Sequence, residues 1–202
     1  MFDSDILSGV RGVLATLHKS TDLQSTAPED TAEGRSMRET LRAIASCNPN
    51  VSVSFATEGV DSPSDSIRII VDGIDSGVEF RVEPKGNLLS PFLYAVVNAG
   101  GSGFTLDSTL LKRARGITNP IKLMTYVGDH SSMTPRALQV INEIVAVNPG
   151  ITNVVVDNAS GHDIMKRYGV ESVPTVLCND VVISDGWASP EDVVRTLERI
   201  SA

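Results

Sequence analysis

Short strand-like segments alternate with amphipathic helices along almost the whole chain, and this alternation limits the fold more than any other feature. In the second half, the segment over 135–147 places Leu138 and Ile141 on one face of a helix. Predicted strands over 121–127 and 151–156 lie on either side of that helix. Such an order of strands and helices predicts an α/β fold.

The remaining elements follow the same pattern. The first half is predicted to hold a helix over 4–17, a weak strand over 21–26 and a helix over 36–47 that the capping box Ser36–Glu39 opens. A strand over 51–55, a β-hairpin over 67–82 and a last helix over 90–100 follow. A bridging helix over 105–115 leads into the second half. After the strand, helix and strand over 121–156, that half continues with a short helix over 162–168, strands over 173–178 and 181–184, and a closing helix over 189–200.

A faint internal repeat links the two halves. Cys47-Asn48-Pro49 and Val147-Asn148-Pro149 each end an amphipathic helix and precede a strand. Each is followed by a hairpin and a final helix, which predicts two copies of one unit. Coincidence is the alternative, because Asn-Pro commonly separates a helix from a strand.

Charge and composition exclude several function classes. The chain has 202 residues and a formal net charge of −8, so it lacks the basic surface that nucleic acids require and would be repelled by an anionic membrane. The first five residues show neither a positive region nor an apolar run, and no stretch of about 18 apolar residues occurs. We therefore expect a cytoplasmic protein.

The two cysteines, Cys47 and Cys178, are far apart and belong to no C-x-x-C pair, and they and the three histidines form no metal-ligand pattern. Cys47 is predicted to lie in the core. Cys178 is predicted to be a small buried hydrophobe, and the alternative is a single reactive thiol.

The strand and helix order of the second half, with Val173-Pro174 just before its third strand, resembles the thioredoxin topology, and the resemblance implies a cis peptide bond before Pro174. More specifically, the chain resembles the N-terminal domain of the flavoprotein (F) subunit of bacterial alkyl hydroperoxide reductase. The segment 80–101 with its double glycine, Tyr126-Val127 and Val147-Asn148-Pro149 carry this resemblance. It implies two fused thioredoxin-like folds, the first degenerate, over 1–101 and 118–202, with a linking helix over 102–117 and mixed sheets flanked by helices.

The chain departs from that family at its redox motif. The family carries C-x-x-C-P before the first helix of its second fold, and in register this chain reads Ser131-Ser132-Met133-Thr134-Pro135. The family's acidic residue facing the motif corresponds to Leu88. Disulfide exchange needs an attacking thiolate and a second, resolving thiol, so hydroxyls at both positions exclude dithiol chemistry in this register.

The hydroxyls of Ser131, Ser132 and Thr134 allow three interpretations. They can cap the helix that Pro135 opens, hold a small anion at its N-terminus, or, with Asp129-His130-Ser131, form part of a hydrolase triad. Adjacent side chains rarely form a triad, so capping is the favoured interpretation.

The sequence therefore predicts a redox-inactive thioredoxin-fold module that binds a protein partner in the groove between the two folds. The partner is expected to be a thiol peroxidase or a flavoprotein reductase, and no flavin, nicotinamide or other cofactor is expected. The binding residues are predicted to be Ser131, Ser132, Met133, Thr134, Val173, Pro174 and Thr175. The competing hypothesis is an electron-transfer enzyme of the peroxide-reduction system that acts through Cys178.

Overall fold

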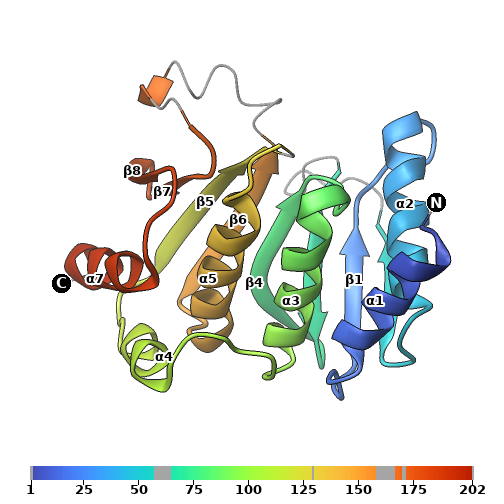
Figure 1. Ribbon diagram of the computed structural model, residues 1–202, viewed down its shortest axis with the longest axis horizontal. Coiled ribbons are helices and arrows are strands. Elements are labelled where there is room, and N and C mark those ends of the chain that lie inside the picture. Colours follow the sequence, from blue (N-terminus) through green and yellow to red (C-terminus); the bar gives the residue numbers. More distant parts are fainter. Residues whose placement is uncertain (1, 57–64, 129, 158–166, 170–171, 202) are drawn as a thin grey trace.

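One mixed sheet of eight strands runs through the molecule in the order β2-β1-β3-β4-β6-β5-β7-β8 (Figure 1). The computed structural model describes residues 2–56, 65–128, 130–157, 167–169 and 172–201. The first half contributes α1 (Ser4–Leu14), β1 (Thr21–Ser25), α2 (Ala32–Ala45), β2 (Val51–Phe55), β3 (Ile67–Val71), β4 (Ile74–Arg81), the 3₁₀ turn η1 (Gly86–Leu88) and α3 (Leu89–Ala99). The second half contributes α4 (Ser108–Arg115), β5 (Ile121–Val127), α5 (Thr134–Val147), β6 (Ile151–Asp157), β7 (Thr175–Cys178), β8 (Val181–Asp185) and α7 (Pro190–Ile200).

Two local expectations need correction. The capping box predicted at Ser36 is wrong, because α2 begins earlier and its N-cap is Thr31, whose side chain accepts a hydrogen bond from the Gly34 amide. Ser36 lies inside the helix, where its Oγ donates to a carboxylate oxygen of Glu83. The second hairpin strand is also longer than expected, since β4 begins at Ile74 directly after the tight turn. Most of the short helix expected over 162–168 lies outside the described residues.

Strand pairing follows the same pattern in both halves. In the first half, β1 pairs in parallel with β2 and antiparallel with β3, and β3 pairs antiparallel with β4. In the second half, β5 pairs in parallel with β6 and antiparallel with β7, and β7 pairs antiparallel with β8. Each half is therefore one copy of the same α/β unit.

The repeated Asn-Pro turns have the same role in the two units. Asn48 Nδ2 donates to the Leu14 carbonyl at 2.7 Å, which ties the end of α2 to the end of α1. Asn148 Nδ2 donates to the carbonyls of Ala114 and Ile117 at 2.8 and 2.9 Å, which ties the end of α5 to the end of α4. Both asparagines also accept a hydrogen bond from the amide two residues later. The short repeat thus marks a structural duplication.

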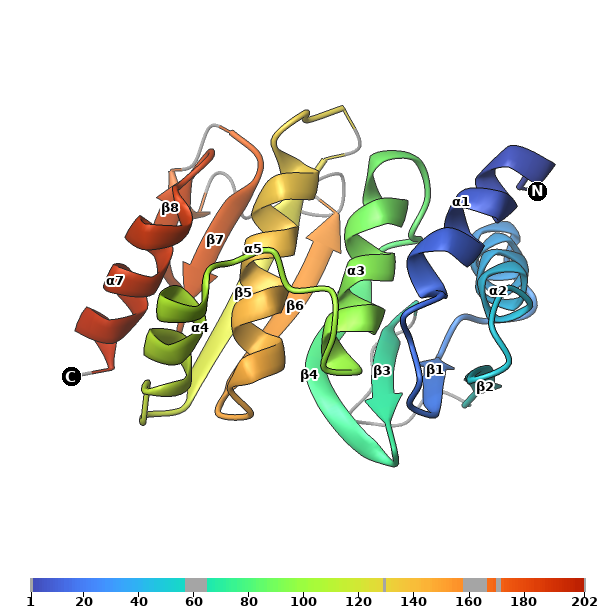
Figure 2. The same cartoon turned by 60° about the horizontal axis from the view of Figure 1, so that its bottom comes forward.

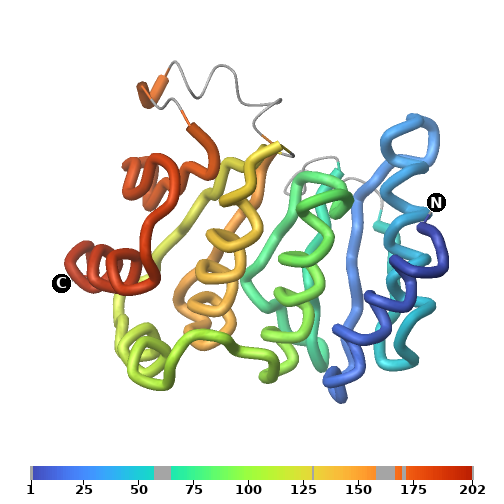
Figure 3. The backbone as a smooth tube through the Cα atoms, in the orientation of Figure 1, coloured from blue at the N-terminus to red at the C-terminus, as the bar shows by residue number. Residues whose placement is uncertain are grey.

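The two units join through parallel pairing of β4 with β6, where Phe80 lies opposite Val155. Figure 2 shows α3, α4, α5 and α7 in front of the sheet, where they cover one of its faces. Buried side chains of the strands and of the helices, including α1 and α2, form one core, in which Phe80 meets the Phe92 ring edge-on with centroids 5.0 Å apart. The tube in Figure 3 shows the two termini at opposite ends of the long axis.

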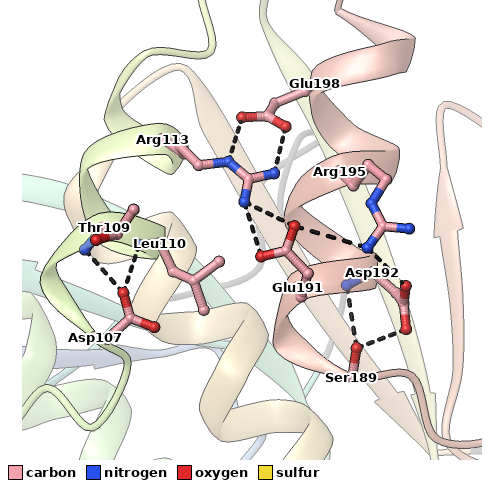
Figure 4. A network of polar contacts seen from close by, with 9 residues as sticks. All are labelled: Asp107, Thr109, Leu110, Arg113, Ser189, Glu191, Asp192, Arg195 and Glu198. Atoms are coloured by element: carbon pink, nitrogen blue, oxygen red, sulfur yellow. Dashed lines mark hydrogen bonds and ion pairs between the residues drawn. The ribbon is translucent and has the colours of Figure 1, made fainter.

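Polar contacts hold the linking segment between the units. Buried Glu143 of α5 accepts hydrogen bonds from the backbone amides of Thr105 and Leu106, both at 2.8 Å. Farther along, Arg113 of α4 donates to carboxylate oxygens of Glu191 and Glu198 on α7 at 2.7 to 2.9 Å (Figure 4). The bridging helix is therefore fixed against the closing helix of the second unit.

Candidate functional site

Two loops of the second unit meet at one edge of the sheet. One follows β5 and leads to Thr134 at the start of α5, and the other precedes β7 and contains Val173-Pro174, whose peptide bond is cis. Because β5 and β7 are antiparallel neighbours, the end of the first lies beside the start of the second. The contact between the loops is a hydrogen bond of 2.9 Å from Ser131 Oγ to the Val173 carbonyl. The fold thus brings together Ser131 and the segment before β7, which the sequence placed in one site.

The hydroxyls of this loop do not cap α5, so the favoured interpretation of them is wrong. The N-cap residue is Met133, and its side chain makes no capping hydrogen bond. Ser131 Oγ instead donates to the neighbouring loop, Ser132 is exposed, and Thr134 Oγ1 is buried without a hydrogen-bond partner. The reason is the position of each residue: Ser131 lies two residues before the N-cap, and Thr134 is already the first residue of the helix, so neither occupies the N-cap position. The anion interpretation stays a prediction.

The hydrolase interpretation has no support in the geometry of Ser131. The hydroxyl of Ser131 donates to a backbone carbonyl. His130 is exposed in the wall of a groove at the carboxyl ends of β4 and β6, and Asp129 lies outside the described residues. A nucleophilic serine needs a base within hydrogen-bond reach of its oxygen.

The segment around the cis-proline is fixed by its own hydrogen bonds. The Pro174 carbonyl accepts from the Gly186 amide at 2.9 Å, and the Val173 carbonyl accepts from Ser131 Oγ. Thr175 Oγ1 donates to the Ser172 carbonyl. Pro174 and Thr175 are buried and Val173 is half-buried, so Val173 is the member of this predicted trio that a partner can reach.

Asn87 belongs to the site although no motif in the sequence points to it. It lies in η1 of the first unit, and its Nδ2 donates to the carbonyls of Gly128 and Ser131 at 3.3 and 3.0 Å. Asn87 therefore links the first unit to the loop that precedes α5. The only sequence signal was its position beside Leu88, which the resemblance placed opposite the motif.

A groove of about 440 Å³ lies at the carboxyl ends of β4 and β6, where the two units meet. Its apolar lining consists of Met37, Val82 and Leu88, and the last of these is buried as part of η1. The remaining lining residues are Glu33, Asp65, Arg81, Glu83, Lys85, Gly86, His130 and Asp157. His130 makes this groove continuous with the loop that carries Ser131.

Neither cysteine lies in an accessible position at this site. The Cys178 side chain is 1% exposed, at the end of β7 and within the core, and burial raises the pKa of its thiol. A buried, protonated thiol is a poor nucleophile, so the burial agrees with the predicted buried hydrophobe and argues against the alternative of a reactive thiol. Cys47 is half-buried in the first unit, where its Sγ donates to the Ala43 carbonyl, and it packs against the core as expected.

Trp187, the single tryptophan of the chain, and His162 make no contact with this site that the structure describes. Trp187 is partly buried against the core, and the Arg136 guanidinium lies 4.8 Å from its ring centroid. His162 lies outside the described residues. Within the described ranges, no three His, Cys, Asp or Glu side chains come together in a way that could hold a metal ion. No described helix combines the length and apolar character needed to cross a membrane.

Comparison with known proteins finds relatives by sequence, although no protein-family model matches the chain. The F subunit of alkyl hydroperoxide reductase from Pseudomonas aeruginosa is 22% identical over 198 residues, which are 98% of this chain and 37% of that protein. A Bacillus subtilis protein named NADH dehydrogenase is 23% identical over 197 residues, which are 98% of this chain and 38% of that protein. The chain thus spans little more than a third of these relatives.

Solved structures with the same fold extend this result. The N-terminal domain of alkyl hydroperoxide reductase AhpF from Enterococcus faecalis superposes with a TM-score of 0.88 at 19% identity, over 98% of this chain and 100% of that one. A protein disulfide oxidoreductase from Aeropyrum pernix superposes with a TM-score of 0.82 at 14% identity, over 100% and 95%. The fold is therefore that of two fused thioredoxin-like units, and over nearly its whole length the chain is similar to the N-terminal domain of the alkyl hydroperoxide reductase AhpF.

Proposed function

We propose that this chain is a redox-inactive thioredoxin-fold module that binds a protein partner where the Ser131–Thr134 loop, the Val173-Pro174 segment and the groove adjoin. The observation that carries the proposal is the contact of Ser131 Oγ with the Val173 carbonyl, directly before the cis-proline. It supports the register in which Ser131 and Thr134 occupy the positions of C-x-x-C in the resembling family. A hydroxyl at a helix N-terminus cannot serve as a two-electron reductant.

The relatives suggest which partner to test. Proteins named as the F subunit of alkyl hydroperoxide reductase match the whole chain, so a thiol peroxidase or a flavoprotein reductase of a peroxide-reducing system, in the cytoplasm, is the partner we propose. Met133 supports a protein contact, because its apolar side chain is 48% exposed beside Ser131 and Thr134.

The binding part of the proposal can be tested by titrating thiol peroxidases and flavoprotein reductases into the full chain by calorimetry. Met133→Asp should weaken binding of the true partner by about tenfold or more, since a charge would replace an exposed apolar contact. Ile200→Asp is a matched control, because Ile200 is 40% exposed at the end of α7, near Asn119 and the start of β5. Equal effects of both variants, or no binding by any candidate, would contradict the proposal.

The register and the loss of redox activity need a separate test. The double variant Ser131→Cys, Thr134→Cys should form a reversible intramolecular disulfide, detected by thiol counting and mass, whereas the parent chain should show no insulin or peroxiredoxin reduction. Failure of the double variant to form the disulfide would contradict the register.

The competing hypothesis makes a different prediction about Cys178. If that thiol carried electrons, the parent chain would show turnover that Cys178→Ala abolishes. Its burial leads us to expect slow alkylation in the native protein and fast alkylation only after unfolding.

A further inference from the structure

The groove between the units combines an apolar floor with charged walls. It opens at the carboxyl ends of β4 and β6, the neighbouring strands contributed by the two units. Crevices outside the carboxyl ends of strands, where the connectivity changes, are the usual binding places of open α/β sheets. Met37 and Leu88 are buried, and they present apolar surface to this space.

The cations of the groove are matched by carboxylates of the protein itself. Arg81 Nε lies 2.6 Å from an oxygen of Glu79, and Lys85 Nζ lies 2.9 Å from an oxygen of Glu83. The other carboxylate oxygen of Glu83 accepts hydrogen bonds from hydroxyls of α2. These charges are therefore largely compensated before any ligand arrives.

Two carboxylates in the groove form no ion pair with a cation of the protein. Among the contacts of the described residues, neither Glu33 nor Asp65 takes part in an ion pair. Asp65 Oδ1 is also buried with no hydrogen-bond partner, on a residue whose φ of 63° lies in the left-handed region. A buried carboxylate oxygen without a donor is costly, and because Asp65 as a whole is only half-buried, a cation placed against its carboxylate from the groove would reduce that cost. The formal net charge of −8 adds long-range attraction for a basic partner.

We infer that the groove receives an extended partner segment that places a lysine or arginine against Asp65 and Glu33 and an adjacent apolar side chain against Met37 and Leu88. This inference rests on the proposed protein-binding function and specifies the chemistry of the partner. The apolar floor supplies burial, while the two carboxylates select for positive charge.

Two matched peptides test this inference with the full chain. They are acetyl-Gly-Leu-Lys-Leu-Lys-Gly-amide and the same peptide with Glu in place of each Lys, titrated at low salt and followed by two-dimensional amide NMR. The basic peptide should shift the amide signals of Lys85, Leu88 and His130, and the acidic peptide should not. Raising the salt to about 0.3 M should weaken the binding, because the charges are partly exposed.

Charge-neutralising variants locate the contact. Asp65→Asn and Glu33→Gln should each weaken binding of the basic peptide by about two- to fivefold, as expected for removal of one partly exposed ion pair. Glu39→Gln is the matched control, because Glu39 is an exposed acid of α2 that lies outside the groove lining. The Glu39→Gln variant should bind the basic peptide with the same affinity as the parent chain.

Several results would overturn the inference. They are equal binding of both peptides, no binding of the basic peptide, or equal affinity of the Asp65→Asn and Glu33→Gln variants and the parent chain. The proposed function is judged separately, by the calorimetric titration with whole partner proteins. A partner whose binding depends on Met133 but not on Glu33 or Asp65 would leave the proposed function standing and refute this inference.

Discussion

Hydroxyl groups near the start of α5 have contrasting environments although they stand close together in the sequence. Ser131 Oγ has a partner in the neighbouring loop, whereas Thr134 Oγ1 is buried and has none. A buried hydroxyl without a partner loses its hydration and gains nothing in return. The side chain of Thr134 therefore weakens the fold at this position, while that of Ser131 strengthens it.

Thr134→Val should leave the free energy of unfolding unchanged or raise it by about 1 kcal/mol, because a methyl group replaces an unpaired hydroxyl. Thr175→Val is the control, and it should lower that free energy by about 1 kcal/mol, since Thr175 Oγ1 donates to the Ser172 carbonyl. Urea unfolding of the parent chain and both variants measures the two effects. If both variants were equally destabilised, Thr134 Oγ1 would have a partner in solution, such as an ordered water.

At the scale of elements, the junctions between helices and strands depend on a few polar side chains. The Asn-Pro turn of each unit joins the end of one helix to the end of the helix before it, and Asn148 is the more buried of the two asparagines, at 6% exposure. Glu83 has a similar role beyond β4, where it accepts hydrogen bonds from Ser36 and Thr40 of α2 and from Lys85. These contacts fix how each helix lies against the sheet.

Asn148→Ala should lower the free energy of unfolding by about 2–3 kcal/mol, because it removes two hydrogen bonds to buried backbone carbonyls and the one from the Gly150 amide, each worth about 1 kcal/mol. Asn48→Ala should cost less, about 1–2 kcal/mol, since Asn48 is half-buried and donates to one carbonyl. Asn119→Ala is the control, because Asn119 donates to the Ser201 carbonyl at an exposed position. Thermal and urea unfolding measure the loss of stability in each variant. A loss for Asn148→Ala no larger than that for Asn119→Ala would contradict the assigned role of Asn148.

Glu83 should make stability depend on pH. Burial alone would raise the pKa of its carboxyl, but hydrogen bonds from Lys85, Thr40 and Ser36 outweigh that effect and hold the pKa below its ordinary value of 4.5. A lowered pKa in the folded state stabilises the fold above the ordinary value, and this contribution is lost as pH falls through the lowered value.

Glu83→Gln should therefore reduce stability at neutral pH and flatten the loss of stability on acidification below about pH 4.5. Urea unfolding at several pH values for Glu83→Gln and the parent chain measures the difference. Glu39→Gln, which removes an exposed carboxylate of α2, is the control for the loss of one negative charge at neutral pH. If the stability of Glu83→Gln and of the parent chain depended on pH in the same way, the assigned role of the Glu83 carboxylate would be refuted.

At the scale of the molecule, the two units share one sheet and one core. The parallel contact of β4 with β6 carries the core across the boundary, and Glu143 of the second unit holds the backbone of Thr105 and Leu106 in the linking segment. Separating the units would expose the edges of two central strands. We therefore expect the boundaries at 1–101, 102–117 and 118–202 to divide structural repeats that do not fold independently.

The full chain should unfold in a single transition that two local probes report together. Trp187 fluorescence reports on the second unit, and alkylation of Cys47 reports on the first. Their urea midpoints should coincide because each unit completes the core of the other. Midpoints separated by more than about 1 M urea would show independent units and contradict the prediction.

Most of the elements and their order could be predicted from periodicity and capping residues alone. The strand over 121–127, the helix from about 135 to 147 and the closing helix with its cap at Ser189 all lie where periodicity and capping residues predicted them. These signals are local, because the residues that produce them lie within one or two turns or on one strand. The start of α2 was misplaced because Ser36 fits a capping box locally, although its real partner, Glu83, lies far along the chain.

The contacts of the site residues, in contrast, depend on the packing of the whole chain. Ser131 with Val173, Asn87 with the loop before α5, and Asp65 with Leu88 in one groove are pairs distant in sequence that strand pairing brings together. The burial of Cys178 likewise depends on the helices that cover β7. Residue type and spacing determine local conformation, whereas hydrogen-bond partners, burial and the shape of a groove depend on how both units pack around one sheet.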